Sequence, residues 1–137
     1  MKQIDFDMAV LIVDDSLAMR KVIRRYLVNH GFTRLLEVGD GRAALDMIRV
    51  RPVDLVISDL NMPVMTGMAL LETLKSNPAT RQIPFIMLTE EAVQTTMNRA
   101  IDLDVDSYIV KPVGEKIFVN EMIRVIRSAG DNAVTLL

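Results

Sequence analysis

The sequence predicts an α/β fold in which a parallel sheet of five strands is covered by helices on both faces. Five short apolar runs, rich in Val, Ile and Leu, each resemble a buried strand rather than a helix. They alternate with segments whose apolar residues recur every three or four positions, as on one face of a helix. Strand–helix repetition with short connections, together with right-handed crossovers, places the helices on both sides of a single sheet.

Composition limits the classes of protein that this chain can represent. Of its 137 residues, 50% are hydrophobic and 25% charged, with a net charge of −2, which favours one globular domain that does not bind nucleic acid. The absence of cysteine excludes disulfides and thiolate metal sites, and the single histidine, His30, excludes a multi-histidine zinc site. No apolar run approaches the roughly 18 to 20 residues of a membrane span, and the first residues do not resemble a signal peptide. We therefore expect a cytoplasmic protein without membrane insertion.

The first strand is expected at Met8–Val13, a continuous apolar run. Ser16 is placed to cap the following helix, which Gly31 ends. A second, shorter strand is expected at Thr33–Val38, and the helix after it ends before Pro52.

The third strand lies in Val53–Pro63, V-D-L-V-I-S-D-L-N-M-P, an apolar run closed by Asn, Met and Pro. The remaining pattern predicts helices at 66–76, 91–103 and 114–128 and strands at 84–88 and 106–110, with the thinnest apolar face in the helix at 91–103. We therefore expect the core at about 8–128, a C-terminal tail at 129–137 and no attached output domain.

Polar side chains stand at the carboxyl ends of four predicted strands: Asp14 and Asp15, Asp59, Thr89 and Lys111. In a parallel sheet these ends meet at one edge, where ligands bind. Two carboxylates about 4 Å apart repel by roughly 4 kcal/mol at an effective dielectric constant near 20, so three acids need compensation beyond one lysine. A divalent cation supplies it, and all-oxygen ligands favour Mg²⁺, with Mn²⁺ as a substitute.

Such a site indicates phosphoryl transfer, because phosphate oxygens of a substrate commonly complete the coordination shell of Mg²⁺. Asp59 is the candidate nucleophile, since it stands alone on a central strand and an aspartate can form an acyl phosphate. Asp14 and Asp15 suit metal ligation, and the carbonyl of Asn61 is a further candidate ligand. Lys111 and the Thr89 hydroxyl are placed to neutralise and hydrogen-bond the phosphoryl oxygens.

Four motifs, L-I-V-D-D-S, V-I-S-D-L-N-M-P-V-M-T-G, I-M-L-T and S-Y-I-V-K-P, resemble those of the receiver domain of bacterial two-component response regulators. The resemblance runs from about Ala9 to Arg127 and is greatest to the single-domain chemotaxis type. It implies a flavodoxin-like (βα)5 fold with strand order 2-1-3-4-5. It also implies a single receiver domain over 1–137.

The resemblance implies that Asp59 accepts a phosphoryl group from a histidine kinase or histidine phosphotransfer protein. Asp14, Asp15, Asp59 and the Asn61 carbonyl would hold Mg²⁺, and Lys111, followed by a cis bond to Pro112, would contact the phosphoryl group. Thr89 and Tyr108 would form the switch pair, which repacks the face made by the fourth helix, fifth strand and fifth helix for a downstream protein. Such a protein catalyses only its own phosphorylation and dephosphorylation, and we expect a monomer, with weak dimerisation left open.

Some features leave alternatives open. Glu90, the run L-D-V-D-S before the fifth strand and Val113 depart from the family pattern, the first placing an acid where a small residue is usual. A phosphorelay intermediate, an excised receiver, an aspartyl-phosphate phosphatase of the haloacid dehalogenase type and a flavin carrier are competing functions. The last two fit less well, because their motifs after the first strand differ from Asp14-Asp15-Ser16.

Two basic features near the first helix can be explained by structural or solvated roles alone. His30 is expected to be structural or solvated at a helix end, where a cation is favourable. The basic strip, Arg20, Lys21, Arg24 and Arg25, is either a solvated face or a docking surface for an acidic partner.

Overall fold

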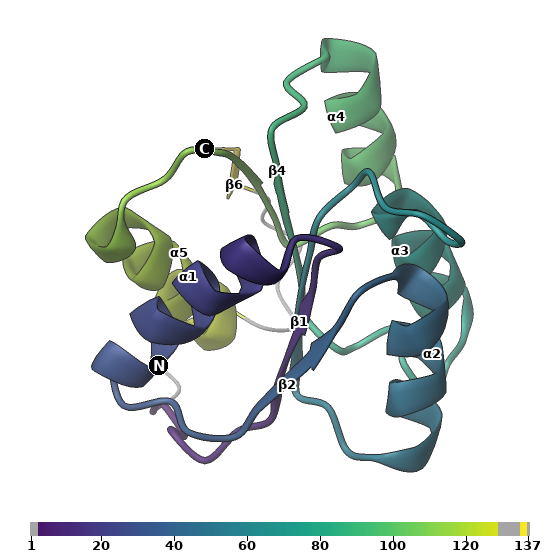
Figure 1. The fold of residues 1–137 in the computed structure, drawn as a ribbon. Helices are drawn as coiled ribbons and strands as arrows, with labels where there is room; N and C mark the ends of the chain where they lie inside the picture. Colours follow the sequence, from purple (N-terminus) through teal and green to yellow (C-terminus); the bar gives the residue numbers. More distant parts are fainter. Residues whose placement is uncertain (1–2, 129–134, 137) are drawn as a thin grey trace.

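Five parallel strands form the centre of the fold in the order β2-β1-β3-β4-β5, as predicted (Figure 1). The computed structural model describes residues 3–128 and 135–136. The strands are β1 (Val10–Val13), β2 (Leu35–Val38), β3 (Leu55–Ser58), β4 (Phe85–Thr89) and β5 (Ser107–Val110). The helices are α1 (Leu17–Asn29), α2 (Gly41–Val50), α3 (Gly67–Ser76), α4 (Gln94–Asp102) and α5 (Glu115–Arg127).

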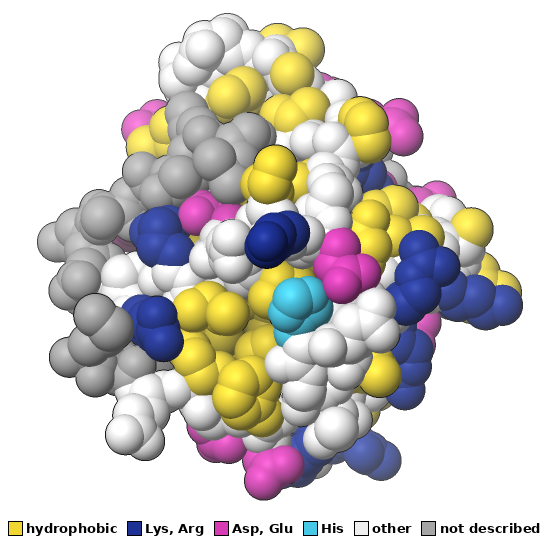
Figure 2. Space-filling model, turned by 90° about the vertical axis from the view of Figure 1, so that its left-hand side faces the viewer, with side chains coloured by type: hydrophobic (Ala, Val, Ile, Leu, Met, Phe, Trp, Pro, Cys, Tyr) yellow, Lys and Arg dark blue, Asp and Glu magenta, His cyan; other side chains and the backbone are white. Residues whose placement is uncertain are grey.

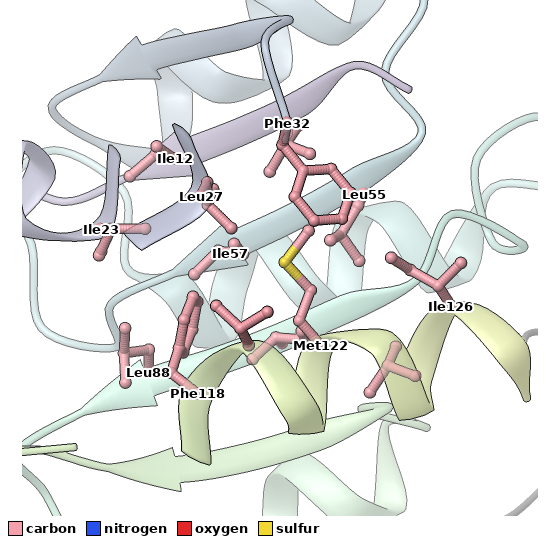
Figure 3. Close-up of a cluster of buried hydrophobic side chains, with 14 of the residues drawn as sticks. Ile12, Ile23, Leu27, Phe32, Leu55, Ile57, Leu88, Phe118, Met122 and Ile126 are labelled. Carbon is pink, nitrogen blue, oxygen red and sulfur yellow. The ribbon is translucent and has the colours of Figure 1, made fainter. Parts of the chain in front are cut away.

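The sheet separates two hydrophobic layers. Helices α1 and α5 cover one face, and α2, α3 and α4 cover the other (Figure 1). Alternate residues of each strand point to opposite faces, so in β1 Val10 and Ile12 pack with α1 and α5, whereas Leu11 and Val13 pack toward α2 and α3. Figure 3 shows the first layer, where Phe118 and Met122 of α5 lie against residues of β3 and β4. Burial on both faces explains why the strands are continuous apolar runs.

Helix starts follow the sequence closely where a capping side chain is present. The Ser16 hydroxyl accepts a hydrogen bond from the Met19 N–H at 3.1 Å, as predicted. Asp40 and Thr66 cap α2 and α3 in the same way. Helix α4 has no side-chain cap, begins at Gln94 and not at Glu91, and has Ala100 as its only fully buried residue. The predicted thin face of this helix is therefore confirmed, but its start was placed three residues too early.

Helices α1 and α5 are joined by polar contacts as well as by packing. The Tyr26 hydroxyl donates to the Val113 carbonyl at 3.3 Å. His30, the C-terminal cap of α1, lies with Nε2 3.1 Å from a carboxylate oxygen of Glu115, and Asn29 donates to the other oxygen. Figure 2 shows this face, with the single histidine (cyan) beside an acidic side chain (magenta). His30 therefore has the structural role expected at a helix end.

A short sixth strand, β6 (Thr135–Leu136), extends the predicted sheet. It pairs in parallel with β5, Thr135 opposite Ser107 and Leu136 opposite Tyr108. This part of the expected C-terminal tail therefore adds to the sheet; the rest of the tail, 129–134 and 137, lies outside the described residues. Among the helices that the structure describes, none has the length and apolar character needed to cross a membrane.

Candidate functional site

The carboxyl ends of β1 and β3 bring three predicted acids together. Ligand oxygens of Asp14, Asp15 and Asp59 all lie within 4.8 Å of one another. Asp14 is buried, Asp15 is exposed and Asp59 is intermediate. This cluster exists because β1 and β3 are neighbours in register, with Val13 opposite Ser58, so both strands end at the same level.

Lys111 provides the positive charge inside this cluster. Its Nζ lies 2.9 Å from Asp14 Oδ2 and 3.5 Å from Asp59 Oδ2, and its side chain is only 10% exposed. The Lys111 N–H donates to the Thr89 carbonyl at 2.8 Å, and the peptide bond to Pro112 is cis, as the resemblance implied. One lysine therefore contacts two of the three acids and leaves a net negative charge in the site.

Backbone contacts fix the two acids that Lys111 contacts. The Asp59 N–H donates to the Val13 carbonyl at 2.9 Å, and one Asp59 carboxylate oxygen accepts from the Leu60 N–H at 2.7 Å. Asp14 accepts from the Ser16 N–H at 2.9 Å through its side chain. The other Asp14 oxygen faces Lys111, so the direction of each carboxylate is set before any ligand binds.

The loop between β3 and α3 is held tightly against the phosphoacceptor candidate. A Cβ atom at Gly67 would lie 2.0 Å from the Asp59 carbonyl oxygen, so only glycine fits there. Within this loop Val64 has a φ of +67°, and the Met65 N–H donates to the Pro63 carbonyl at 2.7 Å. This is a strained γ-turn centred on Val64, a β-branched residue that is 83% exposed.

The acids and Lys111 line an open cavity of about 430 Å³. Asn61, Thr89 and Glu90 also line it. The donor set is made of oxygen atoms, three of them from carboxylates, with no histidine or cysteine, which fits Mg²⁺ or Mn²⁺. A dianionic phosphoryl group would be compensated there by a divalent cation and the lysine together.

The predicted switch pair meets at the backbone of one residue. Thr89 is buried, and its Oγ1 accepts from the Glu91 N–H at 3.4 Å. The Tyr108 ring is fully buried, and its hydroxyl donates to the Glu91 carbonyl at 2.7 Å. Burial, reinforced by the charges of Glu91 and Asp59, raises the pKa of Tyr108 to about 12. Sequence patterns could not reveal this bridging role of Glu91, because its main-chain atoms make both hydrogen bonds.

Two residues of the basic strip have structural partners instead of a free face. Arg20 Nε and Arg24 Nη1 both lie 3.3 Å from the Glu37 carboxylate on β2. Arg20 also donates to the Asp14 carbonyl at 2.5 Å, so it supports the backbone of the acid cluster. Lys21 and Arg25 are exposed, and the ion pairs found in the described part of the chain do not include them. Only these two cations fit the solvated or docking face that was predicted.

The fold and this edge together define a class of protein: a doubly wound α/β domain with an acidic, lysine-bearing cavity at the carboxyl ends of its strands. The family model of the response regulator receiver domain matches residues 10–123 of this sequence. The chain belongs to this family, and the resemblance found in its motifs is confirmed.

Curated relatives and solved structures agree with this assignment. The chain is 38% identical over 105 residues to the chemotaxis protein CheY of Pseudomonas aeruginosa, covering 77% of this chain and 85% of that protein. It is 37% identical over 106 residues to CheY-3 of Vibrio cholerae, covering 77% and 82%.

Among solved structures, the chemotaxis response regulator CheY4 of Vibrio cholerae superposes with a TM-score of 0.80 at 29% identity, covering 87% of this chain and 98% of that chain. The receiver domain of a signal transduction histidine kinase from Syntrophus aciditrophicus gives a TM-score of 0.82 at 30% identity, covering 90% and 93%. The predicted fold class and strand order are therefore confirmed.

Proposed function

We propose that this protein is a phosphorylation-controlled signalling switch in which Asp59 accepts a phosphoryl group from a histidine kinase or histidine phosphotransfer protein. The observation that carries the proposal is the contact of Lys111 with both Asp14 and Asp59 beside the third acid. A salt bridge that served only stability would need one acid, whereas this arrangement leaves uncompensated negative charge for a cation and a phosphoryl group.

Asp14, Asp15, Asp59 and the Asn61 carbonyl would hold Mg²⁺, which when bound supplies positive charge for the phosphoryl oxygens. Residues of the chain itself orient Asp59 and stabilise the phosphoryl group. The Leu60 N–H holds one oxygen of Asp59 and Lys111 lies beside the other, which orients the carboxylate for in-line attack on phosphorus. Lys111 and the Thr89 hydroxyl then stabilise charge on the transferred group.

The change in partner binding would follow from the hydrogen bond between the Glu91 N–H and the Thr89 hydroxyl. A phosphoryl group on Asp59 would offer the Thr89 hydroxyl a charged acceptor, which shifts the backbone of Glu91 to which Tyr108 is bonded. The face of α4, β5 and α5 would thereby change its packing and bind a downstream protein. The two relatives, which are named chemotaxis proteins, favour a chemotaxis-type regulator over a phosphorelay intermediate. We propose that the protein acts in the cytoplasm as a monomer. On this proposal the protein catalyses only its own phosphorylation and dephosphorylation.

The test is phosphoryl labelling of Asp59→Asn. Wild-type protein incubated with acetyl phosphate and Mg²⁺ should acquire one acid-stable, base-labile phosphoryl group, seen by intact-mass spectrometry and phosphate-affinity electrophoresis. Asp59→Asn should not be labelled, while the exposed Asp46→Asn should be labelled like wild type. Labelling of Asp59→Asn would contradict the proposal, and sustained turnover of a small phosphomonoester by wild type would favour the phosphatase alternative.

A further inference from the structure

The inference concerns Glu90, which lines the cavity beside Asp59 but takes no part in the chemistry above. Its side chain is exposed, and it forms neither an ion pair nor a side-chain hydrogen bond with any residue that the structure describes. Its carboxylate is therefore an uncompensated charge at the mouth of the cavity.

The position of Glu90 is fixed although its side chain is free. On one side the Thr89 carbonyl accepts from the Lys111 N–H at 2.8 Å. On the other side the Glu91 carbonyl accepts from the Tyr108 hydroxyl at 2.7 Å. Glu90 thus sits between two anchored residues, so its backbone is held at the cavity and its side chain starts from a fixed point there.

The charges of the cavity then decide which donors can approach. Asp14, Asp15, Asp59 and Glu90 contribute four negative charges and Lys111 one positive charge. A divalent cation changes the total from −3 to −1 and not to zero. The extra charge of Glu90 repels an incoming phosphodonor in proportion to the donor's own negative charge.

We propose that Glu90 is a specificity-determining residue that selects donors with a phosphorylated, protonated nitrogen over fully anionic acyl phosphates. This inference rests on the proposed function of Asp59. In both reactions an Asp59 oxygen forms the new bond to phosphorus. With acetyl phosphate the O–P bond breaks and acetate leaves with the electron pair. With phosphoramidate the N–P bond breaks, and the nitrogen, already protonated, leaves as neutral ammonia.

The net charges of these two small donors make the test quantitative. At neutral pH acetyl phosphate is a dianion, whereas phosphoramidate carries a protonated nitrogen and a net charge of −1. Glu90→Gln should raise the second-order rate constant for acetyl phosphate about two- to fivefold at low salt, the range that one exposed charge interaction supplies. Phosphoramidate should gain only about the square root of that factor, because its charge is half as large.

Further variants separate charge from size. Glu90→Lys should exceed the gain of Glu90→Gln for acetyl phosphate, and Glu90→Ala should match Glu90→Gln if size has no part. Glu72→Gln makes the same change of net charge on α3, away from the cavity, and should leave both rates unchanged. Most of the gain should vanish near 1 M salt, where the Debye length is about 3 Å.

The outcomes distinguish this inference from the proposed function. If neither donor labels wild-type Asp59, the proposed function fails. If wild type is labelled but Glu90→Gln changes both rate constants by the same factor, or does so independently of salt, then selection by charge is overturned. A rise in the ratio of acetyl phosphate to phosphoramidate rates, reduced by salt, supports the inference.

Discussion

Removing one acid of the cluster should stabilise the metal-free protein. In Asp15→Asn the side chain keeps its shape and loses its charge. Each of its two acidic neighbours offers an oxygen within 4.8 Å. Two unit charges at that separation repel by about 0.9 kcal/mol in water and about 3.5 kcal/mol at an effective dielectric constant of 20. Asp15 is exposed, so the lower value applies to each pair, and Lys111 offsets part of the sum.

The expected gain is therefore about 1 kcal/mol in the free energy of unfolding, measured by urea denaturation in a chelator. With a typical m-value of about 2 kcal/mol per molar urea, the midpoint should rise by about 0.5 M. Mg²⁺ should make wild type the more stable of the two proteins. At a Mg²⁺ concentration a hundred times the wild-type dissociation constant, the free energy of unfolding of wild type rises by about 2.7 kcal/mol. If Asp15→Asn binds Mg²⁺ tenfold more weakly, its free energy of unfolding rises by about 1.4 kcal/mol less.

Asp46→Asn is the matched control, since Asp46 is an exposed acid on α2 that pairs with Arg42 and Arg49. It should lose a few tenths of a kcal/mol with or without metal. The reasoning is refuted if Asp15→Asn is less stable than wild type in chelator, or if Mg²⁺ stabilises both proteins equally.

Two other substitutions follow from the site. Because the pKa of Tyr108 rises from 10.0 to about 12 on folding, the unfolded chain ionises first and stability should fall as pH rises through that interval. Tyr108→Phe should flatten this decline in alkaline urea titrations. At neutral pH it should lower the free energy of unfolding by about 1 kcal/mol, because the hydrogen bond to the Glu91 carbonyl is lost. An unchanged alkaline slope would contradict the raised pKa of Tyr108. Val64→Asn should raise the free energy of unfolding by about 1 kcal/mol, seen as a higher urea midpoint, because Asn tolerates the positive φ at this exposed position. A lower midpoint would show that the turn is not strained.

The site was predictable where its geometry follows from strand ends. Asp14, Asp15, Asp59 and Lys111 meet because parallel strands finish at one edge, and periodicity locates those ends to within a residue or two. The roles of the individual residues go beyond geometry and remain predictions for the labelling experiments.

Main-chain and long-range contacts were not predictable. The start of α4 at Gln94 depends on the backbone of Glu91, which Thr89 and Tyr108 hold outside the helix. The positive φ of Val64 contradicts its local preference and is imposed by the surrounding loop. In the described part of the chain β6 consists of Thr135 and Leu136, a segment too short to show a periodic pattern.

The strand order has a consequence for association between copies of the chain. Edge strands carry unpaired backbone groups that can recruit a strand from another molecule. At one edge β6 occupies the ladder positions beside Ser107 and Tyr108, and at the other the short strand β2 carries the charged Glu37. Both edges of the five-stranded sheet are thus protected, one by the pairing of β6 with β5 and the other by a short strand that carries a charge.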